Sequence, residues 1–263
     1  MNDAQKYGAS QDNTVESKAG ASKAAARPVD EDISGPNGDG DARSVEGMTR
    51  VVLRPLASPL PLAFFAFGIG SLLISGQQLG LIPLDETWVV ALVTGSFVFP
   101  LQALAAIFAF LARETLGATA IALISASWLA SAITSYTLPP GTPTATMGLF
   151  QLALAVVLLL LGVIGLSGKP VLAAVILVAA LRYGLDGFYE LTGVAPAEIA
   201  SGILGFLIFA SALYGGLALG LEDVKHRTVL PFGRRGEARD AIEGDLADQI
   251  GPIEDEAGVR KQL

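Results

Sequence analysis

The chain has no cysteine and a single histidine, and these two shortages exclude several kinds of site. Without cysteine there is no disulfide, no thiolate metal site, no iron–sulfur cluster and no cysteine nucleophile. His226 stands in a charged stretch after the last apolar segment, where we expect a surface side chain. One histidine is too few for a metal or haem centre inside the protein, so we predict no bound metal and no cofactor.

Charge is scarce in the middle of the chain. Residues 51–221 carry ten charged side chains, whereas residues 1–50 carry nine acids and six bases and residues 222–263 carry ten acids and seven bases. The net charge of −8 therefore belongs mostly to the two ends, and an acidic balance argues against a nucleic-acid partner.

The two ends have the composition of disordered tails. Residues 1–51 are rich in Ala, Gly, Ser, Asp and Glu and lack the apolar region of a signal peptide. Such segments bury too little apolar surface to offset their ordering entropy. We predict a disordered N-terminal tail over residues 1–51, a transmembrane domain over 52–233 and an acidic C-terminal tail over 234–263.

The motifs of nucleotide-driven and hydrolytic proteins are also missing. The sequence contains no Gly-x-x-x-x-Gly-Lys-Ser/Thr loop and no Gly-x-Ser-x-Gly elbow. We therefore predict that the protein is not an enzyme, and that any transport would run on a solute or proton gradient.

What the sequence has in abundance is long apolar segments. A hydrocarbon core of about 30 Å takes about 20 residues at a rise of 1.5 Å each. Six segments reach that length, and proline and glycine mark most of the breaks between them. We predict an all-α, polytopic membrane protein with six transmembrane helices over Leu60–Leu79, Thr87–Leu111, Thr115–Tyr136, Met147–Leu166, Pro170–Leu191 and Ala197–Leu221.

Basic residues outside the segments lie on one side of the predicted bundle. The three loops on the other side, residues 80–86, 137–146 and 192–196, contain no Lys or Arg. Because basic residues mark the cytoplasmic side of a membrane protein, we predict a multi-pass protein of the plasma or inner membrane with both tails in the cytoplasm.

The sharpest functional signal is an arginine inside the fifth segment. Twelve residues at 1.5 Å place Arg182 about 18 Å from Pro170, slightly past mid-depth. An ionisable group at that depth is costly and normally faces the bundle interior or a water-filled cavity. Asp186 and Glu190 follow at four-residue spacing, so the three side chains share one helix face.

Three interpretations of this charged stripe stay open. Arg182 pairs with Asp186 and extends its head group toward the surface. Alternatively, the stripe forms a contact between helices or subunits. In the functional interpretation it lines an outward-facing vestibule, where Arg182 attracts a carboxylate and Asp186 or Glu190 takes part in proton transfer.

Uncharged polar residues give weaker signals. Gln102 lies mid-segment and needs a hydrogen-bond partner, because burying an unpaired amide costs free energy. Thr119 begins a polar track on the third segment, although such hydroxyls also bond their own helix carbonyls. The many small residues either pack helices together or line a narrow path.

The start of the first segment carries a motif. Residues 58–68 read Ser-Pro-Leu-Pro-Leu-Ala-Phe-Phe-Ala-Phe-Gly and are similar to the signature Asn-Pro-x-Pro-Leu-Gly-Leu. Pro59, Pro61 and Leu62 match, and Ser58 replaces the Asn. The prolines leave Ser58 and nearby carbonyls free at the inner mouth, or they simply begin a helix.

Two further stretches complete a family resemblance. The second stretch covers residues 102–128, and within it residues 115–120 resemble the sequence Asn-Thr-Phe-Gly-Ala-Thr-Ala-Phe. The third stretch, residues 227–233, matches Arg-Thr-Val-Leu-Pro-x-Gly. Tyr214 falls in an Ala-x-x-Tyr-like pattern before that last motif. On these stretches the chain resembles the acetate uptake transporters, also called succinate–acetate permeases, over roughly residues 54–233.

The resemblance implies a six-helix protomer in a hexameric ring, with a separate path through each protomer. It implies uptake of acetate or succinate, either coupled to protons or channel-like. In the family a Phe, a Tyr and a Leu narrow the path; Phe67 matches the Phe, whereas Ile124 and Ala179 stand where the Tyr and Leu would be. Arg182 is foreign to the pattern, and a wider, more positive constriction would select a different or larger carboxylate.

We therefore predict a transporter or channel for small carboxylates, embedded in the lipid bilayer as a homo-oligomer. The predicted substrate path comprises Ser58, Pro59, Pro61, Leu62, Phe67, Gln102, Thr119, Ile124, Ala179, Arg182, Asp186 and Tyr214. A non-transporting sensor or scaffold, suggested by the long tails, and a channel for small neutral solutes are the alternatives.

Overall fold

The computed structural model describes residues 57–225 and 227–235, and within these residues it contains helices and no strand. Six helical stretches are long and apolar enough to cross a membrane, which confirms the predicted all-α, six-span membrane fold. The predicted tails lie outside the described residues, apart from Arg234 and Arg235, and so does His226. The predictions for those regions stay predictions.

The spans match their predicted bounds to within a few residues. The last helix runs four residues past its predicted end at Leu221. The helices are α2 (Leu60–Gln78), α3 (Thr87–Val93) with α4 (Phe99–Leu111), α5 (Thr115–Thr137), α6 (Ala145–Gly165), α7 (Pro170–Thr192) and α8 (Ala195–Lys225).

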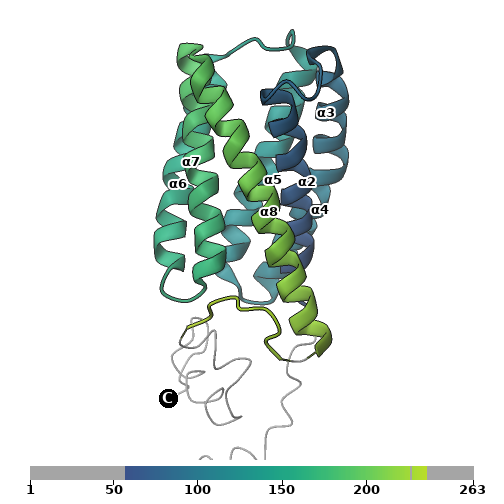
Figure 1. Ribbon diagram of the computed structural model, residues 1–263, viewed down its shortest axis with the longest axis vertical. Helices are drawn as coiled ribbons and strands as arrows, with labels where there is room; N and C mark the ends of the chain where they lie inside the picture. Colours follow the sequence, from purple (N-terminus) through teal and green to yellow (C-terminus); the bar gives the residue numbers. More distant parts are fainter. Residues whose placement is uncertain (1–56, 226, 236–263) are drawn as a thin grey trace, which may run out of the picture. The chain divides into compact units, whose positions relative to one another are not determined.

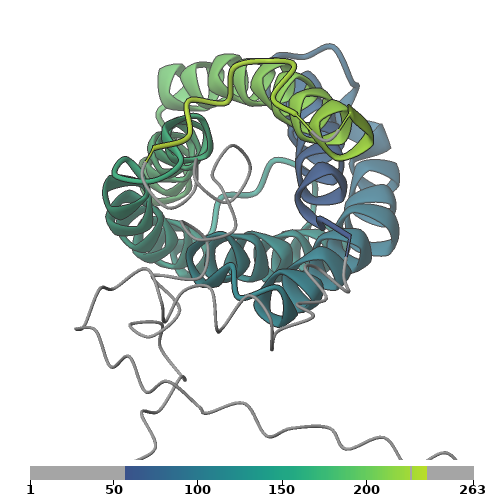
Figure 2. The ribbon, with the colours of Figure 1, turned by 90° about the horizontal axis from the view of Figure 1, so that it is seen from below.

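The spans stand side by side (Figure 1), and they form a ring that follows chain order. Going round, α2 contacts α4, α4 contacts α5, α5 contacts α6, α6 contacts α7, and α7 contacts α8. The contact between α8 and α2 closes the ring, as the view along the bundle shows (Figure 2). Residues from α2, α7 and α8, far apart in sequence, therefore meet along one side of the bundle.

The two ends of the bundle differ in charge. At the end we call the tail end lie the start of α2, the α4–α5 and α6–α7 turns and residues 227–235. At the opposite, loop end lie residues 79–86, 138–144 and 193–194, and this part of the described chain contains no Lys or Arg. In the folded bundle, the described Lys and Arg outside the spans therefore lie at one end only, which is the asymmetry used to predict the orientation in the membrane.

The second span is not a regular helix throughout. A short 3-10 turn over Leu84–Glu86 precedes α3, and residues Thr94–Val98 between α3 and α4 form a π-turn. Pro100 follows two residues after the turn; it has no N–H to donate, and its ring crowds the carbonyl four residues before it, which lies in the turn. A widened turn relieves that crowding, which is a usual cause of such turns in helices.

The chain that follows α8 packs along the tail end of the bundle. Phe232 is 1% exposed and packs edge-on against Phe64 of α2, with ring centroids 6.2 Å apart. Arg234 Nη2 lies 2.9 Å from Glu222 Oε2, and the Arg235 N–H donates to the Gly168 carbonyl at 3.0 Å. Residues 227–235 are therefore packed from α8 to the α6–α7 turn.

Helices α6 and α7 approach closely at a pair of glycines, Gly148 and Gly187. A Cβ added to Gly187 would lie 2.8 Å from the Gly148 carbonyl oxygen and 3.0 Å from the Leu152 backbone nitrogen. Rotation of a side chain cannot relieve a clash with backbone. In a membrane, where packing replaces the hydrophobic drive between helices, small residues allow this approach.

We expect Gly187→Ala to lower the free energy of unfolding by about 1–3 kcal/mol, because the added methyl overpacks this contact. Thermal unfolding in detergent micelles measures the effect. Gly184→Ala is the matched control on the same helix, since its new Cβ would meet Ala155 at 3.8 Å, an ordinary contact. Alanine improves helix propensity in both variants, so equal melting temperatures would contradict the close-packing argument.

Candidate functional site

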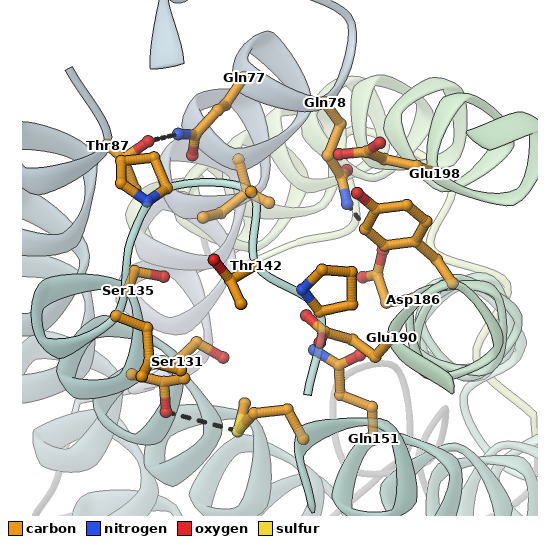
Figure 3. A pocket seen from close by; sticks show the side chains of 18 of the residues that line it. Gln77, Gln78, Thr87, Ser131, Ser135, Thr142, Gln151, Asp186, Glu190 and Glu198 are labelled. Carbon is orange, nitrogen blue, oxygen red and sulfur yellow. Dashed lines mark hydrogen bonds between the residues drawn. The ribbon is translucent and has the colours of Figure 1, made fainter. Parts of the chain in front are cut away.

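A cavity of about 180 Å³ lies among the loop-end halves of the helices, beneath the loop that joins α5 to α6 (Figure 3). At 10–15 Å³ for each water, it has room for on the order of a dozen waters. We call it the central cavity. Its polar lining side chains are Gln77, Gln78, Thr87, Ser127, Ser131, Thr134, Ser135, Thr142, Gln151, Arg182, Tyr183, Asp186, Tyr189, Glu190 and Glu198.

Two aromatic rings belong to the apolar part of the wall. Phe67 of α2 and Trp128 of α5 meet at an angle of 65°, with centroids 6.2 Å apart. Behind them, Gln102 of α4 accepts a hydrogen bond from the Trp128 indole N–H at 2.7 Å and donates to the Ala63 carbonyl at 3.4 Å. Gln102 thus has the partner that its depth requires, and it fixes the indole ring without lining the cavity.

A hydroxyl pair joins α5 to α7 beside these rings. Ser127 donates its proton to the Ile124 carbonyl at 2.7 Å. The Tyr183 hydroxyl lies 2.6 Å from the same serine oxygen. Because a serine hydroxyl has only one proton, Tyr183 is the donor to Ser127. Sequence reasoning missed Tyr183, although its place next to Arg182 within a span was an available signal.

The charged stripe of α7 meets α2 and α8 at the cavity wall. Arg182 Nε lies 3.8 Å from Asp186 Oδ2, and the two residues are 5% and 9% exposed. The Gln78 amide bridges them: its oxygen accepts from Arg182 Nη2 at 3.3 Å, and its nitrogen donates to Asp186 Oδ1 at 2.7 Å. Ser201 of α8 donates to the same Oδ1.

The guanidinium is incompletely satisfied. Among the described residues, Arg182 Nε has no hydrogen-bond partner, because 3.8 Å is too long for a hydrogen bond to Asp186. Gly205 of α8 leaves the space that the guanidinium occupies, since a Cβ there would lie 2.8 Å from Arg182 Cζ. A buried cation with an unused donor is therefore set in the wall of a cavity that is large enough for water.

Two more carboxylates lie nearer the loop end. Glu190 accepts a hydrogen bond from the Thr144 backbone N–H at 2.6 Å, and Glu198 is bonded to the Tyr189 hydroxyl. Figure 3 shows Asp186, Glu190 and Glu198 on the same side of the cavity. The lining thus carries three carboxylates and one guanidinium among the described residues.

Three of the predicted path residues, Phe67, Arg182 and Asp186, lie in the lining of the central cavity. Ile124 and Ala179 are buried behind it. Thr119 bonds its own helix at the Thr115 carbonyl, and Tyr214 is 39% exposed and donates to the Pro231 carbonyl at 2.7 Å.

The remaining predicted residues, Ser58, Pro59, Pro61 and Leu62, lie at the tail-end start of α2. The assignment of all these residues to a substrate path stays a prediction. The Arg182–Asp186 ion pair is present, and both side chains line the central cavity. Arg182 is buried, so its head group does not extend toward the surface. The role of the stripe in carboxylate binding and proton transfer stays a prediction.

No protein-family model matches the sequence, and no curated protein matches it. A solved structure described as the structure of the bacterial acetate channel SatP is similar to the chain, with a TM-score of 0.60 and 24% sequence identity. The match covers 68% of this chain and 99% of that chain. It supports the acetate-transporter-like fold that the sequence resemblance implies, and at this identity it concerns the fold alone.

We expect Gln102→Leu to lower the free energy of unfolding by about 1–3 kcal/mol, because it leaves the buried Trp128 N–H without a partner. Thermal unfolding measures the loss, and the emission of Trp128 should change in a Trp88→Phe background. Gln151→Leu is the control, because the Gln151 side-chain oxygen is buried without a partner and its removal should cost nothing. Equal losses in the two variants would mean that the Gln102–Trp128 bond does not stabilise the fold.

Proposed function

We propose that the protein is a membrane transporter or channel for small carboxylates of the size of acetate, and that the central cavity is the outer part of the substrate path. The observation that carries this proposal is the Arg182 guanidinium, buried in the cavity wall with Nε unpartnered. Charged groups at this depth in membrane proteins mark ion and substrate pathways.

The chemistry of the wall suits a short carboxylic acid. A guanidinium recognises carboxylates through charge-assisted and often paired hydrogen bonds. Phe67 and Trp128 offer an apolar surface for the short hydrocarbon part of the substrate. The volume of about 180 Å³ is below the range of about 300–1,000 Å³ typical of pockets for drug-sized ligands, which favours a small substrate.

The path would continue past Phe67 toward Ile124 and Ala179 and leave near the start of α2. Ile124 and Ala179 are buried, so this stretch is closed in the conformation described and has to open for passage. Ser58, Pro59, Pro61, Leu62 and Tyr214 would then belong to the tail-end mouth, while Gln102 and Thr119 would support the wall from α4 and α5.

We further propose that the tail end faces the cytoplasm of a plasma or inner membrane, because all described Lys and Arg outside α7 lie there. The resemblance to acetate uptake transporters supports a hexameric homo-oligomer. It also supports proton coupling, for which the cavity offers Asp186, Glu190 and Glu198 as proton acceptors. Likeness in fold to a channel accords with a function other than catalysis.

Two alternatives remain to be tested against this proposal. For a sensor or scaffold that displays its tails, residues 52–233 alone would show no transport. A channel for small neutral solutes is favoured by the many hydroxyl and amide groups of the lining, and it would show neither saturation by acetate nor dependence on pH.

Uptake of radiolabelled acetate by proteoliposomes tests the proposal. We expect Arg182→Ala to lower uptake roughly ten- to a hundredfold, because a hydrogen bond to a charged group contributes about 1.5–3 kcal/mol. Arg227→Ala is the matched control, since it removes the same charge from an exposed position at the tail end.

Unchanged uptake by Arg182→Ala would remove the guanidinium from the mechanism. If the folded wild-type protein takes up no small monocarboxylate or dicarboxylate, the proposed substrate class is wrong.

A further inference from the structure

Asp186 occupies the position that a substrate carboxylate would take at Arg182. Its Oδ2 faces Arg182 Nε at 3.8 Å from the neighbouring turn of the same helix. Both side chains lie in the wall of the central cavity. The substrate anion and Asp186 would therefore compete for one guanidinium.

The existing pair is loose on the arginine side. Arg182 Nε has no hydrogen-bond partner among the described residues, and Nη2 reaches the Gln78 oxygen only at 3.3 Å. A guanidinium binds best when a carboxylate lies in its plane and accepts two hydrogen bonds at once. Asp186 does not adopt that geometry, and because Nε is enclosed, a free carboxylate would reach it only after Asp186 moves aside.

The aspartate is held firmly through its other oxygen. Oδ1 accepts hydrogen bonds from Gln78 Nε2 at 2.7 Å and from the Ser201 hydroxyl. Both bonds can persist when the carboxyl is protonated on Oδ2, because a protonated carboxyl keeps acceptor capacity. Asp186 therefore has one oxygen that fixes its position and one that faces Arg182.

A substrate anion would add negative charge to a cavity that already has an excess of it. The charged and titratable groups around Asp186 are Arg182, Tyr183 and Glu190 on α7 and Glu198 on α8, while α2 contributes the neutral Gln78. A bound acetate would therefore be the fourth carboxylate beside a single guanidinium, and like charges repel.

We propose that Asp186 is a built-in stand-in for the substrate: the incoming carboxylate replaces it at Arg182, and Asp186 takes up one proton at Oδ2. The proton comes from the solution in the cavity, so the charge of the cavity is the same before and after binding. Gln78 is a positioning residue that bonds to both partners. This inference rests on the proposed function and gives it a physical basis for coupling one carboxylate to one proton.

The unmodified full-length protein provides the first test. Acetate is added at pH 7 to purified protein in weakly buffered solution with a pH indicator, and a blank without protein is subtracted. We expect the uptake of about one proton for each acetate bound, and affinity for acetate that rises as the pH falls from 7.5 to 5.5. Saturable binding with no proton uptake and no dependence on pH would overturn the inference.

Asp186→Asn provides the second test, because asparagine keeps the oxygen that accepts from Gln78 and Ser201 but has no charge. The chain has two tryptophans, Trp88 and Trp128, and Trp88 is exposed outside the cavity. In a Trp88→Phe background, the emission of Trp128 in the cavity wall reports acetate binding.

We expect Asp186→Asn to bind acetate on the order of tenfold more tightly at pH 7, because the internal competitor is gone, and to take up no proton. Asp85→Asn is the matched control; Asp85 is exposed at the loop end and does not line the cavity, so affinity and proton uptake should be unchanged.

Weaker binding by Asp186→Asn, or proton uptake that persists in it, would overturn the inference alone. Absence of any saturable acetate binding or uptake by the parent protein would instead overturn the proposed function, and the inference with it.

Discussion

A single guanidinium at mid-depth in an apolar bundle constrains the surroundings on three helices. Arg182 cannot be left in hydrocarbon, because the cost of a charged group there is several kcal/mol. The α2 helix supplies Gln78, α8 supplies the space at Gly205, and α7 itself supplies Asp186. Hydropathy alone would favour none of these residues at its position inside a span. This part of the cavity wall is therefore explained by the need to solvate and partner the charge of Arg182.

The six spans could be predicted because bilayer thickness imposes a length that hydropathy reveals directly. The depth of Arg182 followed from the fixed rise of a helix. The partners of Arg182 and Asp186 could not be predicted, because Gln78 and Ser201 come next to these residues only when α2 and α8 close the ring. Helices that are apolar on every side carry little periodic signal of which face meets which helix. The π-turn before Pro100 was missed because proline inside a span has several structural outcomes.

The aromatic residues of the cavity wall show a related limit of sequence reasoning. In the resemblance to the acetate uptake transporters, Ile124 stands where the family has a tyrosine. The predicted constriction therefore had one aromatic ring, Phe67, instead of two. In the structure Trp128, one turn further along α5, meets Phe67, and Gln102 fixes its indole nitrogen. Gln102 was predicted to need a partner, but the identity of that partner depends on how α4 packs against α5.

The distribution of charged residues favours the central cavity as the site at which a ligand would be recognised. Each described charged residue lies either at an end of the bundle or in the central cavity, and the cavity holds Arg182, Asp186, Glu190 and Glu198. A cavity of this size has room for water, which can hydrate groups that lipid could not. A ligand that replaces this water has to supply equivalent partners, and for a guanidinium with an unused donor the best of these is a carboxylate. In the proposed function, hydration of the buried charge and binding of an anion are two states of the same site.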